Sequence, residues 1–367
     1  RYHYLPDTHT AARGRLVLDA MPKPAPSIVW SSQTGRRHAY ERTSDVRQRT
    51  AASQVMLDGM GYPRNKTFDE NAPGFYHCVS RCVRQARLCG RDPVSGRDYE
   101  HRRAWVEARL KDLAESFAVG LYAWAVMSNH THVVLHVDPR AHRHWTDEEV
   151  AFRWARLSRG LEPVPDEKLR IRMRTLLDDP EHLRKIRCRL GNLSWFMRYL
   201  NESIARAANA EDGCTGRFWE GRFRCQALLD ESAVALCMAY VDLNPIRAGL
   251  ADELLESRFT SIRERLLRLA KGTSRGDDRL DAVIGVPDAG GPAISLAAYI
   301  KLVDWTGRNL HKPDAASIEA SAPPALARIE STPAWWFRHA PAVESGFGRA
   351  VGADETLARR GIRRRRL

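Results

Sequence analysis

Short apolar runs alternate with longer amphipathic segments between residues 71 and 255. Four runs rich in aliphatic and aromatic side chains predict strands at 75–81, 121–127, 132–137 and 225–229. Three segments with apolar side chains three or four residues apart predict helices at 99–117, 192–208 and 231–243, the last ended by Pro245. The order strand, helix, strand, strand opens a split βαβ arrangement and predicts an α+β domain.

The flanking segments have a different composition. Residues 1–70 mix Pro, Ser, Arg and Gln and predict a basic irregular arm. This arm either follows the DNA backbone and contacts its phosphates or is a solvated extension. Charged residues and prolines predict a helical insertion at about 140–190. Residues 256–367 predict a mostly helical extension, with helices at 254–269 and 295–310 and a basic tail at 363–366.

The chain carries an excess of positive charge. Its 367 residues include 58 Lys and Arg against 45 Asp and Glu, a formal net charge of +13. Only eight of the 58 cations are lysines, and the guanidinium of arginine can grip phosphate with two parallel hydrogen bonds. Charge and composition therefore favour nucleic acid as the partner.

Cysteine usage and hydropathy favour a cytoplasmic, nucleoid-associated protein without a membrane partner. Seven cysteines are too few for a disulfide scaffold, and no run of 18 apolar residues occurs. Cys78, Cys82 and Cys89 lack the second half of a paired zinc module, so ordinary buried thiols are expected.

A histidine pair interrupts the most apolar stretch of the chain. His130 and His132 are two residues apart at the start of a predicted strand, so their side chains share a face and can converge on one divalent ion. A pair of hydrogen-bonded structural histidines is the alternative. His136 has the same parity but lies about 13 Å beyond His132, so a third ligand must come from another element.

Aromatic and guanidinium side chains alternate between residues 217 and 224. Arg217, Arg222 and Arg224 suit phosphates, and the face of Trp219 suits an unpaired base, which is the composition of a single-strand groove. An edge strand with Phe218 and Phe223 in the core explains the same residues equally well.

The helix predicted from residue 231 carries Tyr240 and, four residues later, Asn244. The two side chains share one helical face, which puts a hydroxyl and an amide a turn apart. A lone tyrosine on an apolar helix is ordinarily a core residue.

Four ordered motifs together resemble the IS200-like single-tyrosine transposases, and within them the REP-associated tyrosine transposases. They are GFYHCVSR at 74–81, VMSNHTH at 126–132, GRFWEGRF at 216–223 and AYVDLNPIRAG at 239–249. The resemblance covers roughly residues 71–255. It implies a ferredoxin-like histidine-hydrophobe-histidine (HUH) nuclease domain with an antiparallel sheet, here with Thr131 as the middle residue.

The resemblance also implies a chemistry. His130 and His132 match the metal pair and Tyr240 matches the nucleophile, with Asn244 as the candidate third ligand of Mg²⁺ or Mn²⁺. The implied reaction is attack of Tyr240 on single-stranded DNA flanking a hairpin, through a 5′-phosphotyrosine intermediate. Arg247, in the last motif, joins the expected DNA contacts. The implied enzyme works as a monomer or a homodimer.

Three other functions compete with this interpretation. A relative that holds DNA hairpins without cutting them would keep the same fold. A zinc deaminase would need H-x-E followed by P-C-x-x-C, and the chain has no such motif. A basic RNA-binding protein of the RNP type would need an aromatic consensus that is missing.

Overall fold

The computed structural model describes residues 67, 69, 72–83, 88–92, 95–158, 160–286, 291–309, 318, 321–344 and 348–362. The chain divides between residues 59 and 60, and every described residue lies in the second of the two units. The predicted basic arm lies almost wholly outside the described residues, as does the arginine tail at 363–366.

The described strands form one six-stranded sheet in a mixed α+β unit, which confirms the predicted fold class at this level. Their order in the sheet is β5-β2-β3-β1-β4-β6. All neighbours are antiparallel except β4 and β6. The strands are β1 (Gly74–Arg81), β2 (Val119–Val126), β3 (His130–Val137), β4 (Arg224–Leu228), β5 (Ile284–Gly285) and β6 (Ala350–Val351).

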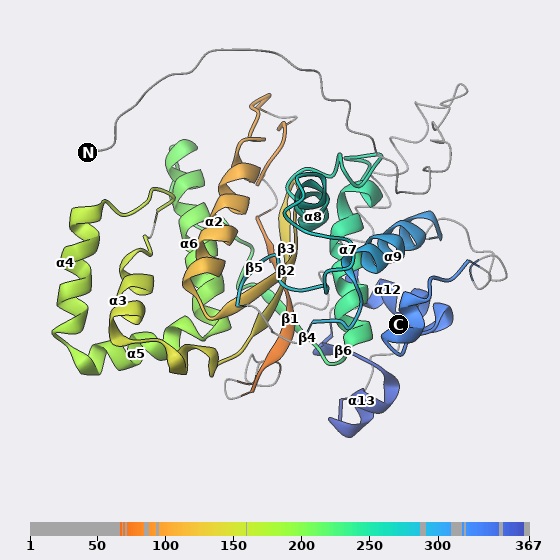
Figure 1. Cartoon of the computed structure of the whole chain (residues 1–367). Coiled ribbons are helices and arrows are strands. Elements are labelled where there is room, and N and C mark those ends of the chain that lie inside the picture. Colours follow the sequence, from red (N-terminus) through yellow and green to blue (C-terminus); the bar gives the residue numbers. More distant parts are fainter. Residues whose placement is uncertain are drawn as a thin grey trace, which may run out of the picture. The chain divides into compact units, whose positions relative to one another are not determined.

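Helices cover both faces of the sheet (Figure 1). One core joins strand residues such as Val133 and Leu135 to α2 (Arg102–Ser116) and α6 (Leu193–Glu211). The other core places Val134, which alternates with them on β3, against α7 (Glu231–Arg247). Alternate residues of β3 therefore pack into two different cores. Its odd-numbered positions from 133 are aliphatic, whereas its even-numbered positions include three histidines.

Helix α7 is longer than predicted. It continues through Pro245 to Arg247, whereas the sequence analysis ended it before the proline. Proline lacks one backbone donor but has a helical φ, and the turn closes around it because Ala248 N–H donates to Asn244 O at 2.9 Å and Leu250 N–H to Pro245 O at 2.8 Å. This prediction was wrong because a proline in the last helical turn costs only one hydrogen bond.

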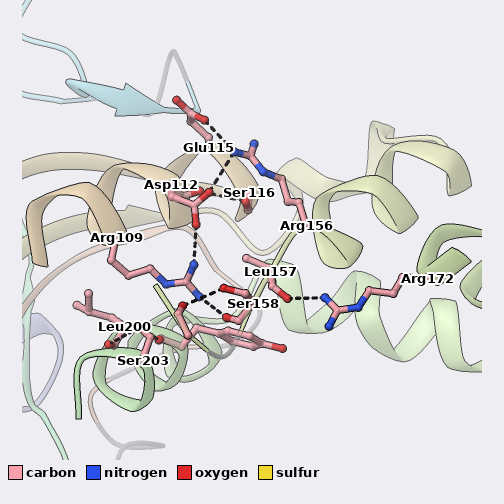
Figure 2. A network of polar contacts seen from close by, with 12 residues as sticks. Arg109, Asp112, Glu115, Ser116, Arg156, Leu157, Ser158, Arg172, Leu200 and Ser203 are labelled. Atoms are coloured by element: carbon pink, nitrogen blue, oxygen red, sulfur yellow. Dashed lines mark hydrogen bonds and ion pairs between the residues drawn. The ribbon is translucent and has the colours of Figure 1, made fainter. Parts of the chain in front are cut away.

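The segment predicted as a helical insertion contains four helices: η2 (Ala141–His144), α3 (Asp147–Ala155), α4 (Asp166–Leu177) and α5 (Pro180–Leu190). Charged contacts tie it to α2 (Figure 2). Buried Arg109 binds Asp112 at 2.7 Å and donates to Ser158 O at 2.5 Å, while Arg156 reaches the same Asp112 at 3.0 Å. Arg172 on α4 donates to Leu157 O at 3.2 Å. The insertion is thus held by guanidinium groups as well as by its apolar contacts.

The C-terminal part adds helices and the two sheet edges. Its helices are α8 (Ser261–Ala270), α9 (Leu296–Asn309), α11 (Ala325–Arg328), α12 (Pro333–Glu344) and α13 (Asp354–Arg359). The helix predicted from residue 254 begins only at Ser261, because Thr260 caps it by accepting from Arg263 N–H and Phe259 has a left-handed φ of 61°. No helix among the described residues is long and apolar enough to cross a bilayer.

Candidate metal and tyrosine site

The two histidines of the pair begin strand β3 directly after a tight turn. Met127 N–H donates to His130 O at 2.9 Å, which closes the β2–β3 hairpin over Ser128 and Asn129. The imidazole centroids of His130 and His132 are 4.8 Å apart with the ring planes at 78°. Two imidazoles bound to one ion at adjacent positions have centroids roughly 5 Å apart, so this spacing fits a shared cation.

The Nδ1 atoms of both imidazoles are held by neighbouring side chains. His130 Nδ1 lies 2.6 Å from Asn129 Oδ1, and His132 Nδ1 lies 2.9 Å from His77 Nε2. Because an amide oxygen only accepts, His130 carries its proton on Nδ1 and presents a lone pair on Nε2. A histidine that binds metal through one nitrogen commonly donates from the other, so His130 fits a divalent ion, and His132 fits one in the tautomer that donates from Nδ1 to His77.

Burial holds these imidazoles neutral. Desolvation, with the nearby imidazoles and Arg247, lowers the pKa of His132 well below its ordinary value. Desolvation and Arg81 lower the pKa of half-buried His130 to about 4. Burial, with a smaller contribution from His130, lowers the pKa of His77 to about 3. Neutral imidazole is the form that binds a metal.

Tyr240 lies on helix α7, which packs on the sheet face that carries the histidine pair. Its ring centroid lies 6.0 Å from that of His132, with the planes at 73°. The Arg247 guanidinium lies 4.5 Å from the centroid of the same tyrosine ring. Tyr240 is a buried residue, with 5% of its surface exposed. The structure therefore brings His130, His132, Tyr240 and Arg247 into one row of contacts.

Asn244 lies one helical turn beyond Tyr240 and is nearly buried. Its Nδ2 donates to Tyr240 O at 3.2 Å, which leaves Oδ1 as the atom available to a ligand. No group of three or more His, Cys, Asp or Glu side chains with metal-binding spacing occurs in the described parts of the chain. Asn244 stays a predicted third ligand, and its Oδ1 is the atom that would bind.

A buried carboxylate anchors the tyrosine helix. Asp242, fully buried on α7, accepts from Tyr299 Oη at 2.5 Å and from Ile262 N–H at 2.9 Å, and it also contacts Ser261 Oγ. Desolvation raises the pKa of Asp242 to about 6 although these donors oppose the shift. The contacts tie α7 to α8 and α9. The sequence analysis missed Asp242, whose only sequence signal is an acidic residue inside an apolar helix.

The arginine-aromatic segment divides cleanly by exposure. Arg217, Arg222 and Arg224 are exposed, whereas Phe218 and Phe223 are buried. Trp219 is also buried, and its Nε1 donates to Asn201 O at 2.8 Å. Trp219 has little exposed surface on which a base could stack, so we leave it out of the DNA contacts proposed below.

His77 and Gln226, which the sequence analysis did not select, complete the polar group beneath α7. They lie opposite each other on β1 and β4, and Gln226 Nε2 is 2.9 Å from His77 Nδ1. Both side chains are fully buried. Each is a polar residue inside an apolar strand, which is a signal, but their pairing depends on the strand register.

Comparison with known proteins adds one structural match. No protein-family model matches the chain, and no curated protein matches it. A solved structure of a REP-associated tyrosine transposase bound to a REP hairpin is similar at 13% identity and a TM-score of 0.30, over 60% of this chain and 93% of that chain. A TM-score of 0.30 is too low to establish a common fold, so the case for function rests on the residues and geometry described above.

Proposed function

We propose that the chain is a metal-dependent single-stranded DNA endonuclease and strand transferase, a transposase, with Tyr240 as its nucleophile. The observation that carries the proposal is the row of ring contacts from His130 through His132 to Tyr240, at 4.8 and 6.0 Å. A metal-binding pair and a nucleophile from two different layers are what phosphodiester attack by tyrosine requires.

The topology supports a ferredoxin-like nuclease domain. The elements β1, α2, β2, β3, α6 and β4 follow one another with helices α3 to α5 inserted before α6, and the central strands stand in the order β2-β3-β1-β4. This is the order expected of a split βαβ domain, in which the first and third strands lie side by side at the centre. Both strands carry histidines of the candidate site.

His130, His132 and the Oδ1 atom of Asn244 are the proposed protein ligands of Mg²⁺ or Mn²⁺. When bound, the cation polarises a phosphate oxygen and neutralises charge in the transition state. The Tyr240 hydroxyl oxygen forms a bond to phosphorus and loses its proton, while the bond to the 3′ oxygen breaks and that oxygen takes up a proton. The product is a 5′-phosphotyrosine, and the 3′-hydroxyl of another strand can reverse the step.

Three exposed arginines and the half-buried Arg247 are the proposed contacts with the DNA backbone. Arg217, Arg222 and Arg224 extend from the segment that leads into β4, and Arg247 lies at the end of the Tyr240 helix. Contacts between guanidinium groups and phosphates position a strand without reading its sequence. The proposed substrate is a DNA hairpin with a flanking single strand. The oligomeric state proposed is monomer or homodimer, since either can deliver the tyrosine.

A second candidate is a DNA-hairpin-binding protein that does not cut. The burial of Tyr240, at 5% exposed, favours it, because a nucleophile that stays covered cannot reach a phosphodiester. The two candidates share the fold and the DNA contacts and differ only in whether the tyrosine becomes accessible when DNA binds.

A covalent-adduct assay tests the proposal. End-labelled hairpin DNA with single-stranded flanks is incubated with the protein and Mn²⁺ or Mg²⁺, then denatured and separated. We expect a metal-dependent adduct that disappears in Tyr240→Phe and His132→Ala and persists in Tyr199→Phe, a half-buried tyrosine on α6. Tight hairpin binding with neither adduct nor cleaved strand would establish the non-cutting alternative.

A further inference from the structure

A line of three polar side chains crosses three adjacent strands beneath α7. Gln226 on β4 contacts His77 on β1 at 2.9 Å, and His77 contacts His132 on β3 at 2.9 Å. Gln226 and His77 are fully buried, and His132 is 6% exposed. His77 uses one ring nitrogen for each neighbour, so neither of its nitrogens is left for another ligand.

Hydrogen-bond chemistry couples the three groups. A neutral imidazole has one donor and one acceptor nitrogen, and an imidazolium buried without a counter-ion would be costly. If His77 donates to His132, it accepts from Gln226, and the His132 proton then lies on Nε2. If His77 instead accepts from His132, it donates to Gln226, and the His132 proton lies on Nδ1. His77 and His132 must therefore carry their protons on the same type of nitrogen.

The Gln226 amide decides between these two states. With its nitrogen toward His77, as described here, His132 Nε2 carries a proton and cannot bind a metal, and Gln226 Oε1 is left buried without a partner. A half-turn of the amide places its oxygen toward His77. The proton then moves to His132 Nδ1, and the lone pair of Nε2 becomes available. The two amide orientations occupy nearly the same volume, so the exchange needs no backbone movement.

We propose that Gln226 and His77 are positioning residues of the metal site, and that the orientation of the Gln226 amide sets, through His77, whether His132 presents a lone pair at Nε2. The inference rests on the proposed metal role of His130 and His132 and assigns two buried residues to it. Outer partners of metal-binding histidines commonly change metal affinity by about 10- to 100-fold when they are replaced.

Nitrogen NMR of the imidazoles tests the coupling directly. Two-bond ¹⁵N–¹H correlation spectra of the metal-free and Zn²⁺-loaded protein report which nitrogen of each histidine carries the proton. We expect His77 and His132 to have the same tautomer in each sample, with both protons on Nδ1 once Zn²⁺ is bound. Opposite tautomers on His77 and His132 in either sample would overturn the relay, and the metal-free measurement does not depend on metal binding or DNA cleavage.

Metal titrations provide the second measurement. We expect Gln226→Met and His77→Phe to weaken Mn²⁺ binding, followed by electron paramagnetic resonance, by about 10- to 100-fold. His136→Phe is the matched control, because His136 lies on the same face of β3 at similar burial, 7% against 6% for His132, and should change the affinity less than about twofold. Melting curves verify that each variant is folded.

The outcomes separate the relay from the proposed function. Folded Gln226→Met and His77→Phe proteins that bind Mn²⁺ like the wild type would overturn the relay and leave the metal pair standing. Loss of binding in His77→Phe as complete as in His132→Ala, with Zn²⁺ shifting the His77 nitrogen directly, would make His77 a ligand and also overturn the relay. A wild-type protein that binds neither ion would overturn the metal site itself, whatever the tautomers are.

Discussion

The Arg247 guanidinium lies 4.5 Å from the centre of the Tyr240 ring, two helical turns along the same helix. This contact places a fixed positive charge beside the proposed nucleophile and restrains the tyrosine ring. Lysine would keep the charge but lose the planar contact with the ring.

Replacing Arg247 should therefore slow covalent-adduct formation. We expect Arg247→Met to lower the single-turnover rate on hairpin DNA by roughly tenfold or more, because an aligned cation near the reacting phosphate is lost, and Arg247→Lys to fall between it and the wild type. Unchanged rates in both variants would restrict Arg247 to a structural role.

Asp242 should make stability depend on pH. The pKa of the Asp242 carboxyl is about 6 in the folded protein, against an ordinary value of 3.8. The folded protein therefore binds this proton more tightly than the unfolded chain. The stabilisation is fully present below the ordinary pKa and is lost as pH rises through 6, by on the order of 3 kcal/mol. Tyr299 and Arg265 are the titratable and charged groups that act on this carboxyl.

Urea unfolding of the wild type and Asp242→Asn measures this effect as a difference, in which the other titrating groups cancel. We expect the free energy of unfolding of the wild type, relative to Asp242→Asn, to decrease between about pH 4 and about pH 7.5. A relative free energy that stays flat or rises over this range would contradict the raised pKa.

Replacing Arg102 should destabilise the folded protein. Its fully buried guanidinium binds Glu211 and Asp212, each at 2.6 Å, and joins α2 to the end of α6. Arg102→Met would remove the buried cation from both carboxylates, although Glu211 would keep its contact with His101 at 2.9 Å, and we expect a loss of about 2 kcal/mol in the free energy of unfolding. Arg206→Met is the control: that arginine side chain is 58% exposed beside Glu202, and its loss should cost less than about 1 kcal/mol. Equal losses in the two variants would refute the role given to burial.

The exposed arginines before β4 should change the salt dependence of hairpin binding. Each of Arg217→Ala, Arg222→Ala and Arg224→Ala should reduce the slope of log affinity against log salt by about 0.7, the contribution of one phosphate contact on a single strand. Arg275→Ala, at a side chain that is 79% exposed and paired with Asp277, should leave the slope unchanged. Identical slopes for all four proteins would place the DNA elsewhere.

The sequence predicted the local elements of the central domain more completely than the site. The hydrophobic pattern located β1 to β4, α2 and α6, and it placed His130 and His132 on one strand face. It missed β5 and β6, which are two residues long and carry no periodic signal. The sequence analysis ended α7 before Pro245 because the residue before a proline disfavours the helical conformation. That tendency does not show whether the last turn of a helix can contain a proline.

The local sequence pattern could not predict that His77 and Gln226 lie beside the histidine pair. His77 meets Gln226 only because β1 and β4 pair in one register, and a shift by one residue would turn one of the two side chains to the other face. The exposure of the arginines and the burial of Trp219 likewise depend on packing against α6, through Asn201.

The two shortest strands finish both borders of the sheet. β5 pairs with β2, and β6 pairs with β4, so the backbone groups of the longer strands meet partners from the C-terminal third of the chain. Unpaired strand borders are templates for intermolecular pairing and aggregation. Residues beyond α8 thus cover both edges of the sheet. A protein shortened to residues 71–255 would keep His130, His132 and Tyr240 but leave backbone groups of β2 and β4 open to pairing with other molecules.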